Sequence, residues 1–202
     1  MNTENRAFRY WLLAAALLTF LSLMMGYGMR FESSAQGCPD FPTCYGQFNI
    51  PLESAARIEM AHRVLAALSG IITIGLTVWA WIRVKNGGRK WTLTGAAILF
   101  TAQLFWGMGL SGTIRVEWLA VVHLAAALIT MGLLTVSATV SFLPRSTAGI
   151  VSLWYRSRLV RLSAGAAAIL FLLMLSGVLV ARLGAASACA GFPFCNGSLP
   201  AS

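Results

Sequence analysis

The stretch from Trp118 to Pro144 reads WLAVVHLAAALITMGLLTVSATVSFLP and contains no Asp, Glu, Lys or Arg. A helix needs roughly 20 predominantly apolar residues to cross about 30 Å of hydrocarbon. The stretch exceeds that length, and its one strongly polar ring is the imidazole of His123. The segment therefore predicts a transmembrane helix that carries a histidine inside the membrane.

Other parts of the chain show the same pattern, and the whole sequence is 58% hydrophobic and only 10% charged. A membrane β-barrel would show shorter segments of alternating polarity, and no such segments occur. The sequence predicts an all-α integral membrane protein with five transmembrane helices. The four further charge-free stretches are Trp11 to Met29, Val64 to Ile82, Trp91 to Ile114 and Leu162 to Ala181.

The first of these stretches follows Arg6 and Arg9, as the apolar core of a cleavable signal peptide does. It is longer than a usual signal core, however, and it lacks a clear small-x-small cleavage site. We therefore expect it to stay as a helix.

The net charge of +9 raises the possibility of a nucleic-acid ligand, but the basic residues are scattered between spans and form no soluble basic face. They indicate topology instead, because cytoplasmic segments of membrane proteins are rich in Lys and Arg. With the N-terminus in the cytoplasm, ten basic residues lie inside and five outside. This predicts a multi-pass protein of the inner (cytoplasmic) membrane with an extracytoplasmic C-terminus. The five outside are Arg30, Arg57, Arg63, Arg115 and Arg182.

Two cysteine pairs follow apolar spans at similar distances, Cys38 with Cys44 and Cys189 with Cys195. Both are C-x5-C, both enclose Phe-Pro, and the second pair lies 151 residues after the first. The repeat predicts a four-helix bundle with its cysteine loop over 1–150, and a fifth helix and second cysteine loop, opening an incomplete second repeat, over 151–202. On the outer side the thiols can oxidise. The spacing suits a structural staple or an exposed, electron-relaying disulfide.

The chain has only two histidines, and each lies near the outer end of an apolar span. His62 begins the second span and His123 lies about a turn and a half into the fourth, so the two lie at similar depth on helices of the same polarity. Two imidazoles that face each other inside a bundle can ligate a haem iron axially. The alternative is that each histidine only hydrogen-bonds a neighbouring helix or interfacial water.

Charged residues flank these histidines. Glu59 lies three residues before His62 and on the same helix face, so it can orient the imidazole or take a proton from a substrate. Alternatively, it pairs in water with Arg57 or Arg63. Arg63 and Arg115 can bind haem propionates, or they extend to lipid headgroups.

Taken together, these motifs resemble the haem A synthase family in order and spacing, along essentially the whole chain. They are GCPDFPTCYGQ at 37–47, Glu59-x-x-His62-Arg63, Gln103-x-x-x-Gly107, His123-Leu and ACAGFPFCNG at 188–197. The resemblance implies a membrane enzyme that oxidises the ring methyl of haem O to the formyl of haem A, the cofactor of terminal oxidases. It also implies that Glu59, His62 and His123 line the substrate site and that Cys38 and Cys44 take part in turnover.

The family is built from two similar four-helix halves, each with a histidine pair. The sequence ends after its second cysteine loop, so a second pair, and the haem B it would hold, has no counterpart in it. We expect either a truncated gene product, a half-size member that completes itself by oligomerising, or a chain that binds haem without full catalysis. The fifth helix, without partners in the chain, favours truncation or assembly with another subunit.

Two other classes of protein share some of these features. A non-catalytic haem-binding assembly subunit of a respiratory complex would also use the two histidines. A quinone-linked disulfide oxidase would have cysteine pairs in its outer loops, but it would need a C-x-x-C motif and has no use for paired intramembrane histidines.

Overall fold

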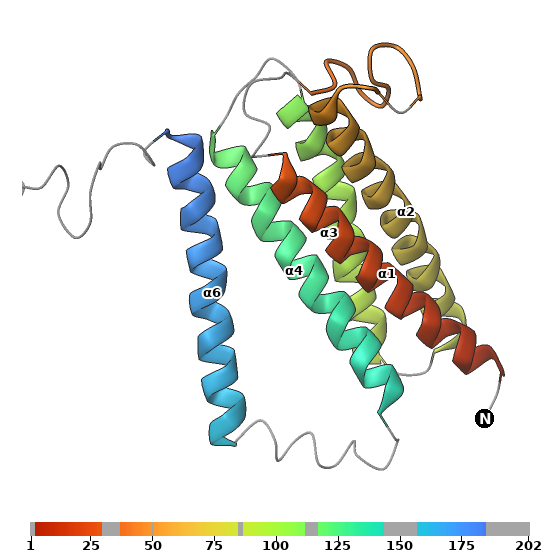
Figure 1. The fold of residues 1–202 in the computed structure, drawn as a ribbon. Coiled ribbons are helices and arrows are strands. Elements are labelled where there is room, and N and C mark those ends of the chain that lie inside the picture. Colours follow the sequence, from red (N-terminus) through yellow and green to blue (C-terminus); the bar gives the residue numbers. More distant parts are fainter. Residues whose placement is uncertain are drawn as a thin grey trace, which may run out of the picture. The chain divides into compact units, whose positions relative to one another are not determined.

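The computed structural model describes residues 3–29, 37–49, 51–84, 87–111, 117–143 and 157–184. These residues form five α-helices and no strand, apart from an isolated bridge between Cys44 and Gln47 (Figure 1). The helices are α1 (Thr3–Gly28), α2 (Ser54–Arg83), α3 (Gly87–Ser111), α4 (Glu117–Phe142) and α6 (Arg158–Arg182). Each is long and apolar enough to cross a membrane, so the predicted all-α fold with five spans is confirmed.

The second helix begins earlier than its charge-free stretch. It starts at Ser54, so Glu59 and Arg63 lie inside the helix, as the expected shared helix face of Glu59 and His62 requires. The helix tolerates these charges because they form an ion pair four residues apart. Absence of charge therefore located the span, and the helix itself begins ten residues before the charge-free stretch.

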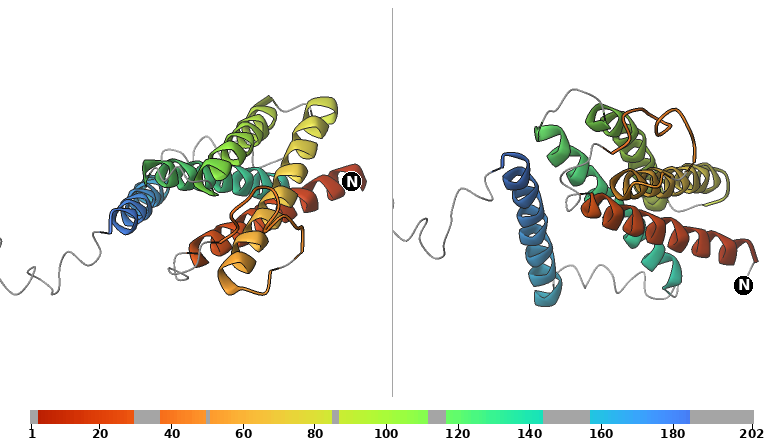
Figure 2. Two further views of the ribbon diagram at one scale, coloured as in Figure 1. Left: turned by 90° about the horizontal axis from the view of Figure 1, so that it is seen from above. Right: turned by 45° about the horizontal axis from the view of Figure 1, so that its top comes forward.

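The chain divides into two compact units. The first comprises residues 1–115 and 126–148, and the second comprises 116–125 and 149–202. In the first unit α2 packs beside both α1 and α3 (Figure 2). The core of this unit is built from side chains of α1 to α4: Phe8, Leu12, Ala15, Ala16, Leu76, Ala80, Leu93, Ala96, Leu134 and Ala138.

The contact between α1 and α2 is lined by small and hydroxyl-bearing residues. Thr19 Oγ1 lies 2.6 Å from Ser69 Oγ, and Ser69 Oγ donates to the carbonyl oxygen of Ala15 at 2.9 Å. Small side chains allow transmembrane helices to approach closely, and hydroxyl groups hydrogen-bond across the contact. The buried face of α1 continues through Ser22, one turn further along, to the position of His62 on α2.

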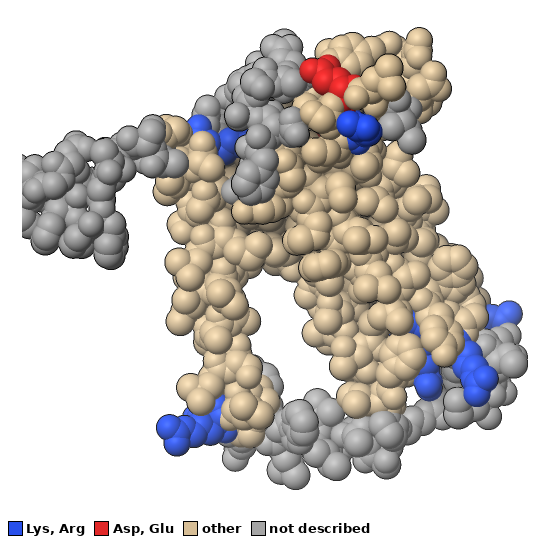
Figure 3. Space-filling view, in the orientation of Figure 1, with Lys and Arg blue, Asp and Glu red and all other residues tan. Residues whose placement is uncertain are grey.

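The second unit contains the start of α4 and the helix α6. The hydroxyl of Ser157 caps α6 by accepting a hydrogen bond from Val160 N at 3.2 Å. Across its described residues α6 buries a single side chain, Val178. Its basic residues lie at its two ends, and the long stretch between them carries no charge (Figure 3). An apolar surface on every side is typical of a helix that contacts lipid.

Candidate functional site

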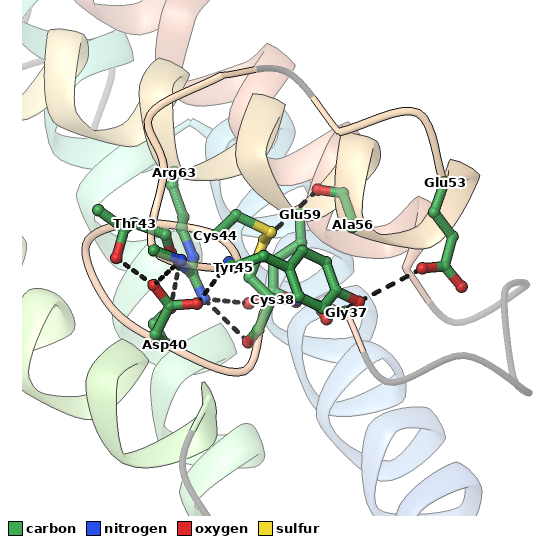
Figure 4. The surroundings of a disulfide bond; sticks show 11 residues. Gly37, Cys38, Asp40, Thr43, Cys44, Tyr45, Glu53, Ala56, Glu59 and Arg63 are labelled. Atoms are coloured by element: carbon green, nitrogen blue, oxygen red, sulfur yellow. Dashed lines mark hydrogen bonds and ion pairs between the residues drawn. A yellow bond between two sulfur atoms is a disulfide. The ribbon is translucent and has the colours of Figure 1, made fainter.

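A cysteine loop, residues 37–49, packs against the first turns of α2 (Figure 4). Cys38 and Cys44 form a disulfide whose two residues are only 4% and 3% exposed. They form a small buried cluster with Ala56 and Met60 of α2. The disulfide is thus enclosed between the loop and the helix, so a reductant has little access to the sulfur atoms while the loop stays in place.

The tip of the loop is a turn held by the carboxylate of Asp40. The carboxylate accepts hydrogen bonds from the Thr43 hydroxyl, from Tyr45 N at 2.6 Å and from Gly46 N at 3.0 Å. Tyr45 and Gly46 adopt φ values of 55° and 73°, the left-handed region that few residues other than glycine enter. Asp40 stabilises this turn because its oxygens bind the amide groups that the turn exposes.

The hydrogen bonds also make the stability of this loop dependent on pH. The bond from the Thr43 hydroxyl, together with those from the Gly46 and Tyr45 amides, holds the pKa of the Asp40 carboxyl below its ordinary value. A lowered pKa in the folded state stabilises the loop above the unfolded pKa, roughly 3.9, and this stabilisation is lost as the pH falls through the folded pKa. We expect the protection of the Tyr45 and Gly46 amides against hydrogen exchange to decrease over that acidic range.

The same exchange measurement on Asp40→Asn provides the control, since asparagine does not titrate. After correction for intrinsic exchange, its protection should vary little with pH. A wild-type protein with constant protection from pH 5 downward would contradict the role of Asp40.

Arg63 fastens the cysteine loop to α2. Its Nη1 donates to the carbonyl oxygens of Asp40 and Thr43, both at 2.7 Å, and its Nη2 donates to Glu59 Oε1 at 2.5 Å. The guanidinium carbon also lies 5.2 Å from the centre of the Phe41 ring. The Arg63 side chain is 10% exposed, so the structure places it under the loop, where a propionate would have to compete with these contacts.

Glu59 is engaged on both of its oxygens. Oε1 accepts from Arg63, and Oε2 accepts from the backbone N–H of Cys38 at 2.9 Å. A Cβ on Gly37 would clash with Oε2, so a larger residue at this position would require the Glu59 carboxylate to shift. The pairing of Glu59 with Arg63 is formed, but the Glu59 side chain is only 16% exposed. Arg57, the other partner considered, is exposed on the helix surface.

His62 lies one turn after Glu59 and contacts α1. Its Nδ1 is 2.8 Å from the carbonyl oxygen of Ser22 and 3.1 Å from the Ser22 hydroxyl. A carbonyl oxygen can only accept, so the short contact requires hydrogen on Nδ1, and in the neutral ring Nε2 then carries the lone pair. A Cβ on Gly26 would lie 3.2 Å from the imidazole Cε1, so glycine leaves the space that the ring occupies.

The other residues of the predicted site lie outside the contacts between the cysteine loop, α1 and α2 described above. His123 lies on α4, half-buried, in the second compact unit, and its juxtaposition with His62 stays a prediction. Arg115, Cys189 and Cys195 fall outside the described residues. Sequence reasoning missed Ser22 and Gly26, and it quoted Gly37 in the cysteine motif without giving it a role. The spacing of Ser22 and Gly26, four residues apart on the buried face of α1, is the pattern that could have revealed these two.

Known proteins resemble this chain along nearly its whole length. The family model described as cytochrome oxidase assembly protein, COX15-CtaA, matches residues 9–202. A protein named heme A synthase from Symbiobacterium thermophilum is 27% identical over 205 residues, covering 96% of this chain and 65% of the relative. Relatives of the same name from Exiguobacterium sp. and Halalkalibacterium halodurans are 28% and 27% identical, covering 87% of this chain and 58% and 59% of their own lengths.

The chain thus spans less than two thirds of the length of these relatives. The family model nevertheless covers all five span-length helices from residue 9 onward, together with both cysteine pairs and both histidines. The chain therefore belongs to the COX15-CtaA family of cytochrome oxidase assembly proteins, the family of the haem A synthases.

Proposed function

We propose that this protein is a haem-binding membrane oxidoreductase that converts the ring methyl of haem O to the formyl of haem A. The observation that carries the proposal is the hydrogen bond of His62 to the Ser22 carbonyl. Because Nδ1 makes this bond, the neutral ring holds its lone pair on Nε2. Family membership supports it, because relatives that match 87% or more of this chain bear the name heme A synthase.

The haem-ligating set we propose is His62 with His123. Neutral imidazoles ligate metals through a lone-pair nitrogen, and the second nitrogen commonly donates to a carbonyl or carboxylate. His62 meets this requirement through Ser22. The bound porphyrin would supply a redox-active iron and, as haem O, the methyl group. Conversion of that methyl to a formyl takes one oxygen atom from water and passes four electrons to an external acceptor. Haem B is a further candidate ligand.

Glu59 is the proposed proton-handling group of the site. It lies one helical turn from His62, and its carboxylate is held between Arg63 and the backbone of the cysteine loop. The two hydrogen bonds leave further lone pairs on the carboxylate, which can take a proton. Movement of the cysteine loop would release Cys38 N from Oε2, so Cys38 and Cys44 would affect turnover by holding this loop closed.

We further propose that the N-terminus lies in the cytoplasm and that the cysteine loops and C-terminus lie outside the inner membrane. The excess of basic residues in the segments placed inside supports this orientation. In that orientation Arg115 lies at the outer boundary, where it could bind a propionate. The partners implied are the lipid bilayer, the haem, and either a second copy of the chain or subunits that assemble the terminal oxidase.

A quinone-linked disulfide oxidase is the less favoured function. Its substrate dithiol would have to attack Cys38 or Cys44, and both are buried against Ala56 and Met60. A non-catalytic haem-binding subunit shares the haem site with the proposed enzyme, so only the product distinguishes the two.

The test is the haem content of cells that express the full chain together with a source of haem O. We expect extraction to yield haem A, and we expect Glu59→Ala to abolish it while haem binding persists. Glu53→Ala is the matched control, because Glu53 is an exposed carboxylate that precedes α2 by one residue. A chain that binds haem but yields no haem A would overturn the enzymatic assignment and favour the binding subunit.

A further inference from the structure

We infer that Ser22 and Gly26 of α1 are positioning residues that fix the tautomer and the ring orientation of His62. The inference rests on the proposed function in one respect, namely that His62 is a ligand of haem iron. Nothing in the sequence motifs that define the site includes these two residues, which lie 40 and 36 positions before the histidine.

The Ser22 carbonyl sets the tautomer. At 2.8 Å from Nδ1 it is the closer of the two Ser22 oxygens, and it offers only lone pairs, so the opposite tautomer would place two lone pairs against each other. Inside an apolar bundle such a contact has no water to relieve it. The Nδ1–H tautomer is therefore favoured before any ligand binds.

Gly26 sets the position of the ring. The imidazole packs over the backbone of α1 at this residue, where an added Cβ would lie 3.2 Å from Cε1 and 3.3 Å from Nδ1. Contacts at those distances are tight, and the helix backbone cannot move aside easily because α1 is packed against α2 along its buried face. A methyl group there would push the ring away from the Ser22 carbonyl. The rotated ring would then no longer direct the Nε2 lone pair toward the iron.

Loss of this arrangement should weaken the ligand as well as displace it. A hydrogen bond from Nδ1–H to a carbonyl raises the basicity of Nε2, and loss of such a second partner of a metal-binding histidine typically costs about 10- to 100-fold in affinity. A weaker imidazole donor also stabilises ferric iron less, so the midpoint potential of the haem should rise.

The experiment compares Gly26→Ala with Gly28→Ala in the full-length, detergent-solubilised protein. At Gly28 the added Cβ lies 3.6 Å from Ile58 Cγ2, an ordinary contact, so the same substitution two residues away is a matched control. We expect Gly26→Ala to lower haem affinity about 10- to 100-fold and to raise the midpoint potential. We expect Gly28→Ala to behave as the wild type. Ser22→Ala, which keeps the carbonyl, should retain most of the affinity.

A second measurement reports the tautomer without haem. The chain contains only two histidines, so selective 15N labelling gives two imidazole groups, which a His123→Gln variant assigns. We expect His62 to be Nδ1-protonated in the haem-free protein and in Gly28→Ala, and to become a mixture of tautomers in Gly26→Ala. This spectrum also shows whether the variant is folded.

The outcomes separate the two hypotheses. If His62→Ala loses haem but Gly26→Ala keeps wild-type affinity, potential and tautomer, the inference fails and the proposed haem site stands. If the 15N spectrum shows the expected tautomers but His62→Ala keeps the haem unchanged, His62 is not the haem ligand. The inference that Ser22 and Gly26 position it for the iron is then wrong as well. A larger loss in Ser22→Ala than in Gly26→Ala would overturn the assignment to the carbonyl.

Discussion

Replacing His62 by alanine is expected to abolish the low-spin haem spectrum of the purified protein. Alanine offers no lone pair to the iron, and the ring that fills the space over Gly26 is lost with it. His123→Ala should have the same effect if the second imidazole completes the axial pair. The measurement is the absorption spectrum of oxidised and reduced protein, with total haem determined after extraction.

The control for this prediction is Ser69→Ala on the same helix. Ser69 is fully buried and hydrogen-bonds α1, so its removal disturbs the same helix contact without removing a ligand. Such a hydrogen bond contributes about 0.6 kcal/mol in a membrane protein, too little to unfold the bundle. A spectrum that is unchanged in both histidine variants would remove the bis-histidine site, while a spectrum lost equally in Ser69→Ala would indicate a fold defect.

Replacing Arg63 by methionine is expected to release the cysteine loop from α2. Methionine keeps an apolar stem but removes the donors to Asp40 O and Thr43 O and the cation that pairs with Glu59. Removing one partner of a buried ion pair typically costs about 3–5 kcal/mol, because the remaining charge stays buried and unpaired. Since 1.4 kcal/mol corresponds to about tenfold in an equilibrium, the open form of the loop should be populated at least about 100-fold more often.

Loop opening can be followed through the Cys38–Cys44 disulfide, which is buried while the loop is closed. The rate of its reduction by a water-soluble phosphine, read by alkylation and mass spectrometry of the loop peptide, should rise strongly in Arg63→Met. Arg57→Met is the matched control, because Arg57 lies on the same helix but is exposed. Equal reduction rates in wild type, Arg57→Met and Arg63→Met would show that Arg63 does not hold the loop.

Local pattern was sufficient for the spans and insufficient for the ends of helices. The charge-free stretch beginning at Val64 located the second span, and the spacing of Glu59 and His62 extended the helix back to Glu59. The helix α2 begins five residues earlier still, at Ser54. A rule based on the absence of charge counts each charge as a cost. It takes no account of the ion pair between Arg63 and Glu59, nor of the hydrogen bonds that both side chains form with backbone groups of the cysteine loop.

By itself, the sequence determined that this chain is a five-span membrane protein with histidines at the ends of spans and paired cysteines beside them. Those properties depend on the order of neighbouring residues: hydrophobic length against bilayer thickness, and short spacings along one chain. Only the tertiary structure decided that the Ser22 carbonyl holds Nδ1 of His62 and that Arg63 and Gly37 enclose Glu59. Periodicity gives the face on which a side chain lies, but the atom opposite it comes from a segment 20 to 40 residues away, whose position is set by packing.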